Sequence, residues 1–209
     1  SLKMKKLFNN LKINRIIWYL TFSDIFSWGL FFVINTIAGI YLSEKLGEKT
    51  VEIVGIGFAI YMIVRGLLQI PLGSVTDKFK AQGDEIAFLF LGNLLMGFPF
   101  VLFPFINNAG FYYVLQLVFG IGSSLNLVSW RKLFALNMDK NREGLAYGIY
   151  AAFISISTAL FSVIAGFLAS HGQETFDLLI FIFGLFIMFS TVWPVLIYLH
   201  KKRPAIPSI

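Results

Sequence analysis

The sequence predicts an all-α integral membrane protein. Hydrophobic residues make up 57% of the 209-residue chain, and its mean hydropathy is +0.78. Only 13% of the residues are charged, whereas soluble domains carry about 25%. The charged residues form short clusters between long apolar runs, which is the pattern of helices that cross a bilayer.

The apolar runs predict six transmembrane helices. A hydrocarbon core of about 30 Å needs roughly 20 residues of helix. Six runs meet that length: 16–42, 51–74, 86–106, 111–135, 145–169 and 176–199. We expect one transmembrane domain, residues 16–199, between an N-terminal segment, 1–15, and a tail, 200–209. Residues 1–3 are interpreted as a cloning remnant ahead of a natural start at Met4.

Lysines and arginines indicate the orientation in the membrane. Of the 17 Lys and Arg residues, only Lys45, Lys49 and Arg65 lie outside the N-terminal segment, the second and fourth loops and the tail. The positive-inside rule therefore places both termini in the cytoplasm. Because Met4-Lys5-Lys6 resembles a bacterial start, we expect the inner membrane of a prokaryote. The net charge of +6 follows from this topology, so no nucleic-acid partner is expected.

Small residues form a stripe along the second predicted helix and another along the fifth. Their members are Gly55, Ala59 and Gly66, and Ala152, Ser155, Ala159, Ser162 and Gly166. In lipid, helices associate where small residues let their backbones approach closely. Packing within one bundle and contact with a second bundle both explain such stripes, and the sequence leaves both open.

Two charged residues lie deep inside apolar runs, away from the ends of the runs: Asp24 in the first and Arg65 in the second. An arginine at the bilayer centre costs about 2.5–3.5 kcal/mol. At about 1.5 Å of rise per residue, Asp24 and Arg65 lie at similar depths, about 15 Å and 13 Å from the cytoplasmic ends of their helices. We therefore expect them to pair, either as a structural ion pair or as a site where substrate or a proton competes for one partner.

Polar side chains share a face on the first helix and on the fourth. These faces carry Asp24, Trp28 and Asn35, and Gln116, Ser123, Asn126 and Trp130. Each polar residue alone is explained by an interhelical hydrogen bond, but two aligned faces indicate a water-accessible cavity. The predicted substrate or coupling residues are Asp24, Arg65, Trp28, Asn35, Gln116, Ser123 and Asn126.

The chain lacks the residues that common catalytic sites need. It has no cysteine, and its two histidines, His171 and His200, lie near predicted helix ends. We therefore expect no metal site and no cofactor. Zinc-peptidase, serine-hydrolase and phosphate-loop motifs are also absent from the sequence. The chain is thus predicted to bind a small-molecule substrate in the lipid bilayer without being an enzyme.

The loop after the second predicted helix carries a recognisable motif. Gly73-Ser-Val-Thr-Asp77-Lys78 places an aspartate four residues after a glycine and a basic residue directly after it. This segment resembles the cytoplasmic loop motif of the major facilitator superfamily. The later positions differ, because Lys80 replaces the second glycine of that motif and residues 81–82 replace its basic pair.

Two further segments resemble the same family. Residues 116–122 are similar to the fourth-helix motif, with Gln116 in place of its arginine, and residues 139–148 are similar to the loop and start of the fifth helix. The antiporter motif of the fifth helix is not met, because Phe161-Ser162 stands where glycine-proline is expected. The resemblance covers the chain in order and implies one six-helix bundle with a 3+3 inverted repeat.

The resemblance also implies how the chain is assembled. Family members have two six-helix halves that meet through their second and fifth helices and the counterparts of these helices. We therefore expect a parallel two-fold homodimer, with the two stripes of small residues as its interface. In the family the loop aspartate helps to hold the halves closed on the cytoplasmic side. The predicted gating residues are Gly73, Asp77, Lys78 and Arg142.

Two functions remain open at this point. The first is a secondary active transporter, a symporter or an exporter, that moves a small solute by alternating access and couples to protons through Asp24. The second is a non-transporting membrane module, either an assembly subunit or the truncated first half of a twelve-helix transporter. The sequence does not identify the substrate, the direction of transport or the coupling ion.

Overall fold

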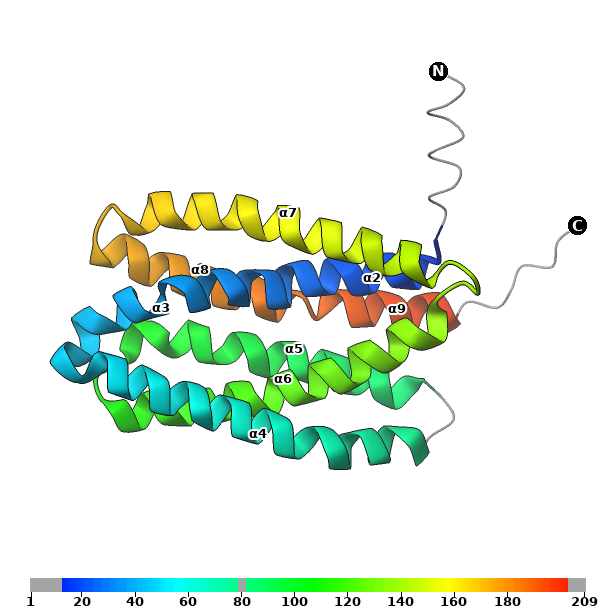
Figure 1. The fold of residues 1–209 in the computed structure, drawn as a ribbon, viewed down its shortest axis with the longest axis horizontal. Coiled ribbons are helices and arrows are strands. Elements are labelled where there is room, and N and C mark those ends of the chain that lie inside the picture. Colours follow the sequence, from blue (N-terminus) through cyan, green and yellow to red (C-terminus); the bar gives the residue numbers. More distant parts are fainter. Residues whose placement is uncertain (1–12, 79–81, 203–209) are drawn as a thin grey trace, which may run out of the picture.

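A computed structural model describes residues 13–78 and 82–202 (Figure 1). Its elements are α2 (Arg15–Asp24), the π-helical turn η1 (Ile25–Gly29), α3 (Leu30–Leu46), the 3-10 turn η2 (Gly47–Lys49), α4 (Thr50–Lys78), α5 (Gly83–Leu102), the 3-10 turn η3 (Phe103–Phe105), α6 (Ala109–Asn137), α7 (Glu143–Ala169), α8 (Gln173–Phe189) and α9 (Val192–Lys202). The cloning remnant, most of the predicted N-terminal segment and tail, and Lys80 of the loop motif lie outside the described residues.

The described residues are all-helical, as predicted, and contain no strand. Five of their helical runs are long and apolar enough to cross a membrane: 15–78, 83–105, 109–137, 143–169 and 173–202. The first run spans 64 residues, which is more than one crossing needs. It doubles back at Gly47, so that α4 returns beside the rest of the bundle (Figure 1).

Short polar segments end and restart the helices. Gly47 and Gly172 have positive φ angles of 71° and 113°, which glycine adopts without steric cost. The side chains of Asn14 and Asn108 accept hydrogen bonds from backbone N–H groups in the first turns of α2 and α6. These caps satisfy donors that a helix start leaves free. The local sequence therefore accounts for where these helices begin and turn.

Helix α5 packs against α6 on one side and α8 on the other. Glycines make both contacts close. A Cβ atom on Gly92 would lie 2.6 Å from the backbone nitrogen of Asn126 in α6, and one on Gly97 would lie 2.5 Å from the carbonyl oxygen of Gly184 in α8. Only glycine fits such distances, and close backbone approach is how helices associate without a hydrophobic driving force.

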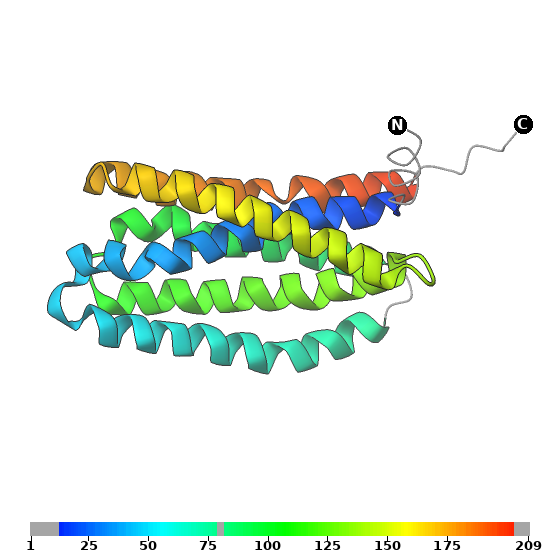
Figure 2. The same ribbon diagram turned by 45° about the horizontal axis from the view of Figure 1, so that its top comes forward.

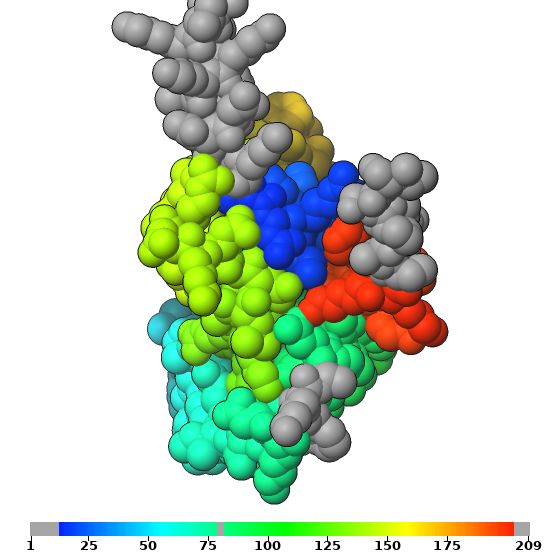
Figure 3. Space-filling model, turned by 90° about the vertical axis from the view of Figure 1, so that its right-hand side faces the viewer, coloured from blue at the N-terminus to red at the C-terminus, as the bar shows by residue number. Residues whose placement is uncertain are grey.

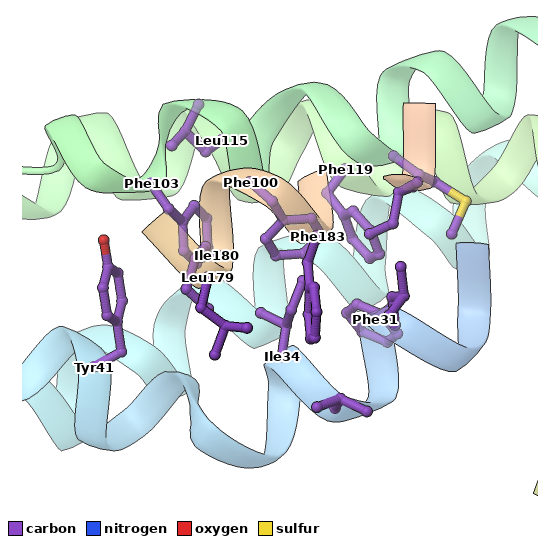
Figure 4. Close-up of a cluster of buried hydrophobic side chains, with 14 of the residues drawn as sticks. Phe31, Ile34, Tyr41, Phe100, Phe103, Leu115, Phe119, Leu179, Ile180 and Phe183 are labelled. Carbon is purple, nitrogen blue, oxygen red and sulfur yellow. The ribbon is translucent and has the colours of Figure 1, made fainter. Parts of the chain in front are cut away.

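The main apolar core fills the half of the bundle away from the chain termini. Figure 4 shows its aromatic residues, including Phe31 of α3, Phe100 of α5 and Phe119 of α6. The rings of Phe31 and Phe119 are stacked with their centroids 4.6 Å apart. At the far end, Lys45 forms an ion pair with Asp177 at 3.1 Å and joins α3 to α8.

Helices α4 and α7 lie at the periphery (Figure 2). In α7 only Ala146 and Ala165 are buried, and α4 packs mainly on α6. The two helices pack against the bundle from different sides, and much of each helix remains exposed. The cavity described below lies between them.

One end of the bundle gathers the start of α2, the end of α9, the end of α4 and the α6–α7 turn. Figure 3 looks onto this end, where α2 (blue) and α9 (red) lie side by side. Lys78, Lys201 and Lys202 lie on the last turns of helices that finish here, and Arg131 and Lys132 lie within the last two turns of α6. Lys45 and Lys49 lie at the opposite end.

Candidate functional site

A cavity of about 450 Å³ lies between α2–α3, α4, α6 and α7. Its lining residues are Asp24, Trp28, Phe31, Phe32, Asn35, Phe58, Tyr61, Met62, Arg65, Leu127, Trp130, Arg131 and Tyr150. Most are aromatic or apolar, and three carry charge. Phe32, Phe58 and Met62 are 47%, 45% and 38% exposed, so an apolar rim of the cavity remains uncovered in this chain.

Asp24 is held at a distortion of the first helix. It precedes the π-helical turn Ile25–Gly29, and π-turns often occur at functional sites. Its side chain is buried, and Tyr150 of α7 donates a hydrogen bond to its Oδ2 at 2.8 Å. Ser27 lies within 3.5 Å of Oδ1. Oδ2 thus has a hydroxyl donor, whereas the Ser27 hydroxyl lies closer to the carbonyl oxygen of Ser23, at 3.0 Å. In the described ranges neither carboxylate oxygen forms an ion pair.

Arg65 lies near the middle of α4 and is half-buried. Its Nη1 donates to the hydroxyl of Tyr61 at 2.5 Å, and its Cζ lies 5.1 Å from the centroid of the Tyr61 ring. Among the described residues, the ion pairs involve Lys45 and Lys132 but not Arg65. The expected Asp24–Arg65 pair is therefore wrong, because Arg65 turns toward its own helix and Asp24 toward Tyr150.

A buried chain of hydrogen bonds runs from the cavity wall into the bundle. The indole Nε1 of Trp28 donates to Oδ1 of Asn126 at 2.7 Å, and Nδ2 of Asn126 donates to Oδ1 of Asn93 at 2.6 Å. Asn93 in turn donates to Ser23 at 2.9 Å and to the carbonyl oxygen of Ser190 at 3.2 Å. Every polar group of the two amides thus has a partner, which such a buried network requires.

This chain of hydrogen bonds ends where the last helical run breaks. Pro194 has no N–H to donate to the carbonyl of Ser190, four residues earlier. The helix breaks between Phe189 and Val192, as the proline predicts. The carbonyl oxygen of Ser190 accepts instead from the backbone N–H of Trp193 at 3.2 Å and from Asn93 at 3.2 Å, so a neighbouring helix helps to satisfy the broken backbone.

The structure brings together some of the predicted substrate residues and separates others. Asp24, Trp28, Asn35 and Arg65 line the same cavity. Gln116 instead lines a small adjoining hollow of about 40 Å³, toward the far end. Ser123 and Asn126 are fully buried and do not line the cavity. The polar face of the first helix therefore faces the cavity, whereas that of the fourth is partly used for packing.

The predicted gating residues lie near a cluster of charges at the end that carries the termini. Asp77 is exposed and pairs with Lys132 of α6 at 3.4 Å. Lys132 also contacts Glu85 of α5 at 2.6 Å, and Glu85 is fully buried. Gly73 lies one turn before Asp77 in α4, where its carbonyl accepts from Thr76.

Two other predicted gating residues flank this cluster. Lys78 is exposed at the end of α4, and Arg142 immediately precedes α7. Through its contacts with Asp77 and Glu85, Lys132 itself joins α4, α5 and α6 at one point within a single chain.

The small-residue stripes face outward. All eight predicted interface residues are exposed: Gly55, Ala59, Gly66, Ala152, Ser155, Ala159, Ser162 and Gly166. A Cβ atom on Gly55, Gly66 or Gly166 would meet nothing within 4 Å. The stripes are therefore not used for packing within this bundle, and they lie on α4 and α7, the two peripheral helices that flank the cavity.

Several cavity residues escaped prediction. Tyr150, Tyr61 and Arg131 belong to the site, whereas Trp130, which also lines it, was already on the predicted polar face of the fourth helix. Tyr61 could have been found from its position four residues before Arg65, since such pairs meet on a helix surface. Asn93 could have been found as a lone amide in an apolar run. No cluster of three or more metal-ligating side chains occurs in the described ranges.

Comparisons with known proteins agree on a family. The family model described as Major Facilitator Superfamily matches residues 17–208. A protein of Methanocaldococcus jannaschii, described as an uncharacterized MFS-type transporter, is 25% identical over 154 residues. That alignment covers 74% of this chain but only 38% of the relative, so the chain spans well under half of the relative's length. No solved structure matches the chain.

Proposed function

Because the chain belongs to the major facilitator superfamily, we propose that it is a secondary transporter that moves a small solute by alternating access. One observation carries this proposal: Asp24 and Arg65 line a cavity whose apolar rim is exposed between α4 and α7. Intramembrane charges are costly and usually mark a transport pathway. A cavity with one uncovered side fits a site that a second bundle completes.

The proposed second bundle is another copy of this chain in a parallel two-fold homodimer. The exposed stripes on α4 and α7 support this, because small residues allow close helix contact and no described helix of the same chain covers them. In this dimer α4 of one protomer packs on α7 of the other, and the two cavities merge. We propose six crossings for each copy, arranged as a 3+3 repeat, and the fold-back at Gly47 within the 64-residue first run supports this number.

Asp24 is the proposed proton-coupling group. It is a buried carboxylate on the cavity wall, bonded to the hydroxyl of Tyr150 and in no ion pair with another described residue, so a proton can neutralise it without breaking such a pair. Asp77 and Lys132 are the proposed cytoplasmic latch, at the end where basic residues gather. By the positive-inside rule we propose that this end faces the cytoplasm. The proposed location is the inner membrane of a prokaryote.

Flux into proteoliposomes tests the proposal. Purified protein is reconstituted, a pH gradient is imposed, and uptake of radiolabelled solutes is compared with that of empty vesicles. We expect uptake driven by the gradient, and we expect Asp24→Asn to abolish its dependence on pH. An Asp24→Asn protein with unchanged flux and pH profile would remove the coupling role, and the absence of flux for every solute would contradict transport.

A second candidate is a half-bundle completed by a different chain. The relative from Methanocaldococcus jannaschii extends well beyond the aligned part, so the same exposed face would also accept the other half of a longer transporter. Mass measurement in lipid nanodiscs separates the two. A dimer supports the two-fold assembly, and a strict monomer that gains flux only with a partner chain supports the alternative.

A further inference from the structure

We propose that the cavity selects a small organic anion with a flat apolar body, whose negative group binds Arg65. The inference rests on the proposed function, since it names the class of solute carried. The inference comes from a difference in hydrogen bonding between the two charged residues inside the membrane, Asp24 and Arg65. Asp24 is buried and bonded to the hydroxyl of Tyr150, whereas Arg65 is half-buried and keeps donors without a protein partner among the described residues.

Arg65 lacks an anionic partner among the described residues. A guanidinium group has five N–H donors, and the side chain of Arg65 makes one hydrogen bond, to the neutral hydroxyl of Tyr61. Tyr61 also orients the group, because the guanidinium lies over its ring. Placed near the middle of α4 and on the cavity wall, Arg65 offers its remaining donors to a ligand. Carboxylates match the planar fork of those donors.

Asp24 does not offer an equivalent site for a cationic ligand. Only 3% of its surface is exposed, and hydroxyl groups of Tyr150 and Ser27 lie against its two oxygens. The other charged residue on the wall, Arg131, is positive and exposed, and its guanidinium donates to the neutral Gln69 at 3.4 Å and to no carboxylate among the described residues. The accessible charge of the cavity is therefore positive, which favours an anion over a cation or a zwitterion.

Aromatic side chains around Arg65 set the shape of the ligand body. The ring of Tyr61 lies 5.6 Å from that of Phe58 and 5.9 Å from that of Phe31, in edge-on arrangements. Phe58 is exposed toward the open side of the cavity. A flat ring in the ligand would stack on these aromatic side chains or meet them edge-on. A volume of about 450 Å³ is sufficient for one small aromatic molecule.

A charge series of matched size tests the inference. The probes are 3-phenylpropionate, 3-phenylpropanamide and 3-phenylpropylamine, titrated against the full chain in nanodiscs by calorimetry. We expect the carboxylate to bind at least about tenfold more tightly than the amide or the amine, because a hydrogen bond to a charged group is lost. Arg65→Gln should remove this preference, whereas Arg65→Lys should retain part of it. Lys49→Gln, a charge removal at the far end of the bundle, is the matched control.

The outcomes separate this inference from the transport proposal. Equal binding of the three probes, no binding of any, or carboxylate binding by Arg65→Gln at the wild-type level would overturn the anion site. Carboxylate binding without flux would support the site and contradict transport. Flux of a cation or a neutral solute that Arg65→Gln leaves unchanged would support transport and overturn the anion site.

Discussion

Trp28 of the cavity wall and Asn126 of α6 are joined by a hydrogen bond of 2.7 Å, although they lie 98 positions apart in the chain. Through Asn93, the same chain of bonds reaches the carbonyl of Ser190 at the helix break. The indole is thus fixed by groups from α5, α6 and the α8–α9 junction. Hydrogen bonds thus link a residue of the cavity wall to the break in the last helical run.

Asn126→Ala should destabilise the protein by about 0.5–2 kcal/mol, the range of single polar contacts between membrane helices. The variant leaves Nε1 of Trp28 and Oδ1 of Asn93 buried without partners. Unfolding of purified protein in detergent measures the loss. Asn107→Ala is the control, because Asn107 is exposed and bonds only its neighbour Asn108. Equal stability of the two variants would show that this chain of hydrogen bonds does not contribute to the stability of the protein.

Gly92→Ala should cost about 1–3 kcal/mol, because its added methyl would press on the backbone of Asn126 at 2.6 Å. Gly66→Ala, by contrast, adds the same atom where nothing lies within 4 Å. Thermal unfolding of the two variants under conditions that keep the chain monomeric makes the comparison. A Gly92→Ala protein as stable as Gly66→Ala would contradict the close α5–α6 packing.

The sequence was sufficient to predict the class of fold. Each membrane helix satisfies its own backbone hydrogen bonds, so long apolar runs and the turns between them identify helices without knowledge of their neighbours. Glycines, however, look alike in the sequence. The small residues of the two stripes face outward, whereas Gly92 and Gly97, which belong to neither stripe, make close internal contacts.

The site could be predicted only as far as single helices determine it. Asp24, Trp28 and Asn35 were found together because they share one face of one helix. The pairing of Asp24 with Arg65 was wrong because equal depth does not fix which way each side chain turns. Tyr150 and Asn93 contact Asp24 and Asn126 across helices distant in sequence, and no local pattern encodes how those helices are rotated.

Lys132→Met should destabilise the protein by about 3 kcal/mol, because it leaves the buried carboxylate of Glu85 without its cation. Asp77→Asn should cost less than about 1 kcal/mol, since the side chain of Asp77 is 78% exposed and such pairs are weak. Chemical unfolding at neutral pH measures both. Introducing Glu85→Gln into the Lys132→Met protein should recover part of the loss, and a double variant no more stable than Lys132→Met would argue against the ion pair.

Gly66→Trp in α4 and Ala159→Trp in α7 should each block self-association, because a bulky ring would stand where the proposed contact needs small residues. Neither position contributes to the buried core of the single chain, so the monomer should remain folded. Native mass spectrometry from nanodiscs measures the fraction of dimer. Leu185→Trp is the control, since Leu185 is 45% exposed on α8, away from both stripes. If the control and the two stripe variants dimerise alike, the partner helices lie elsewhere.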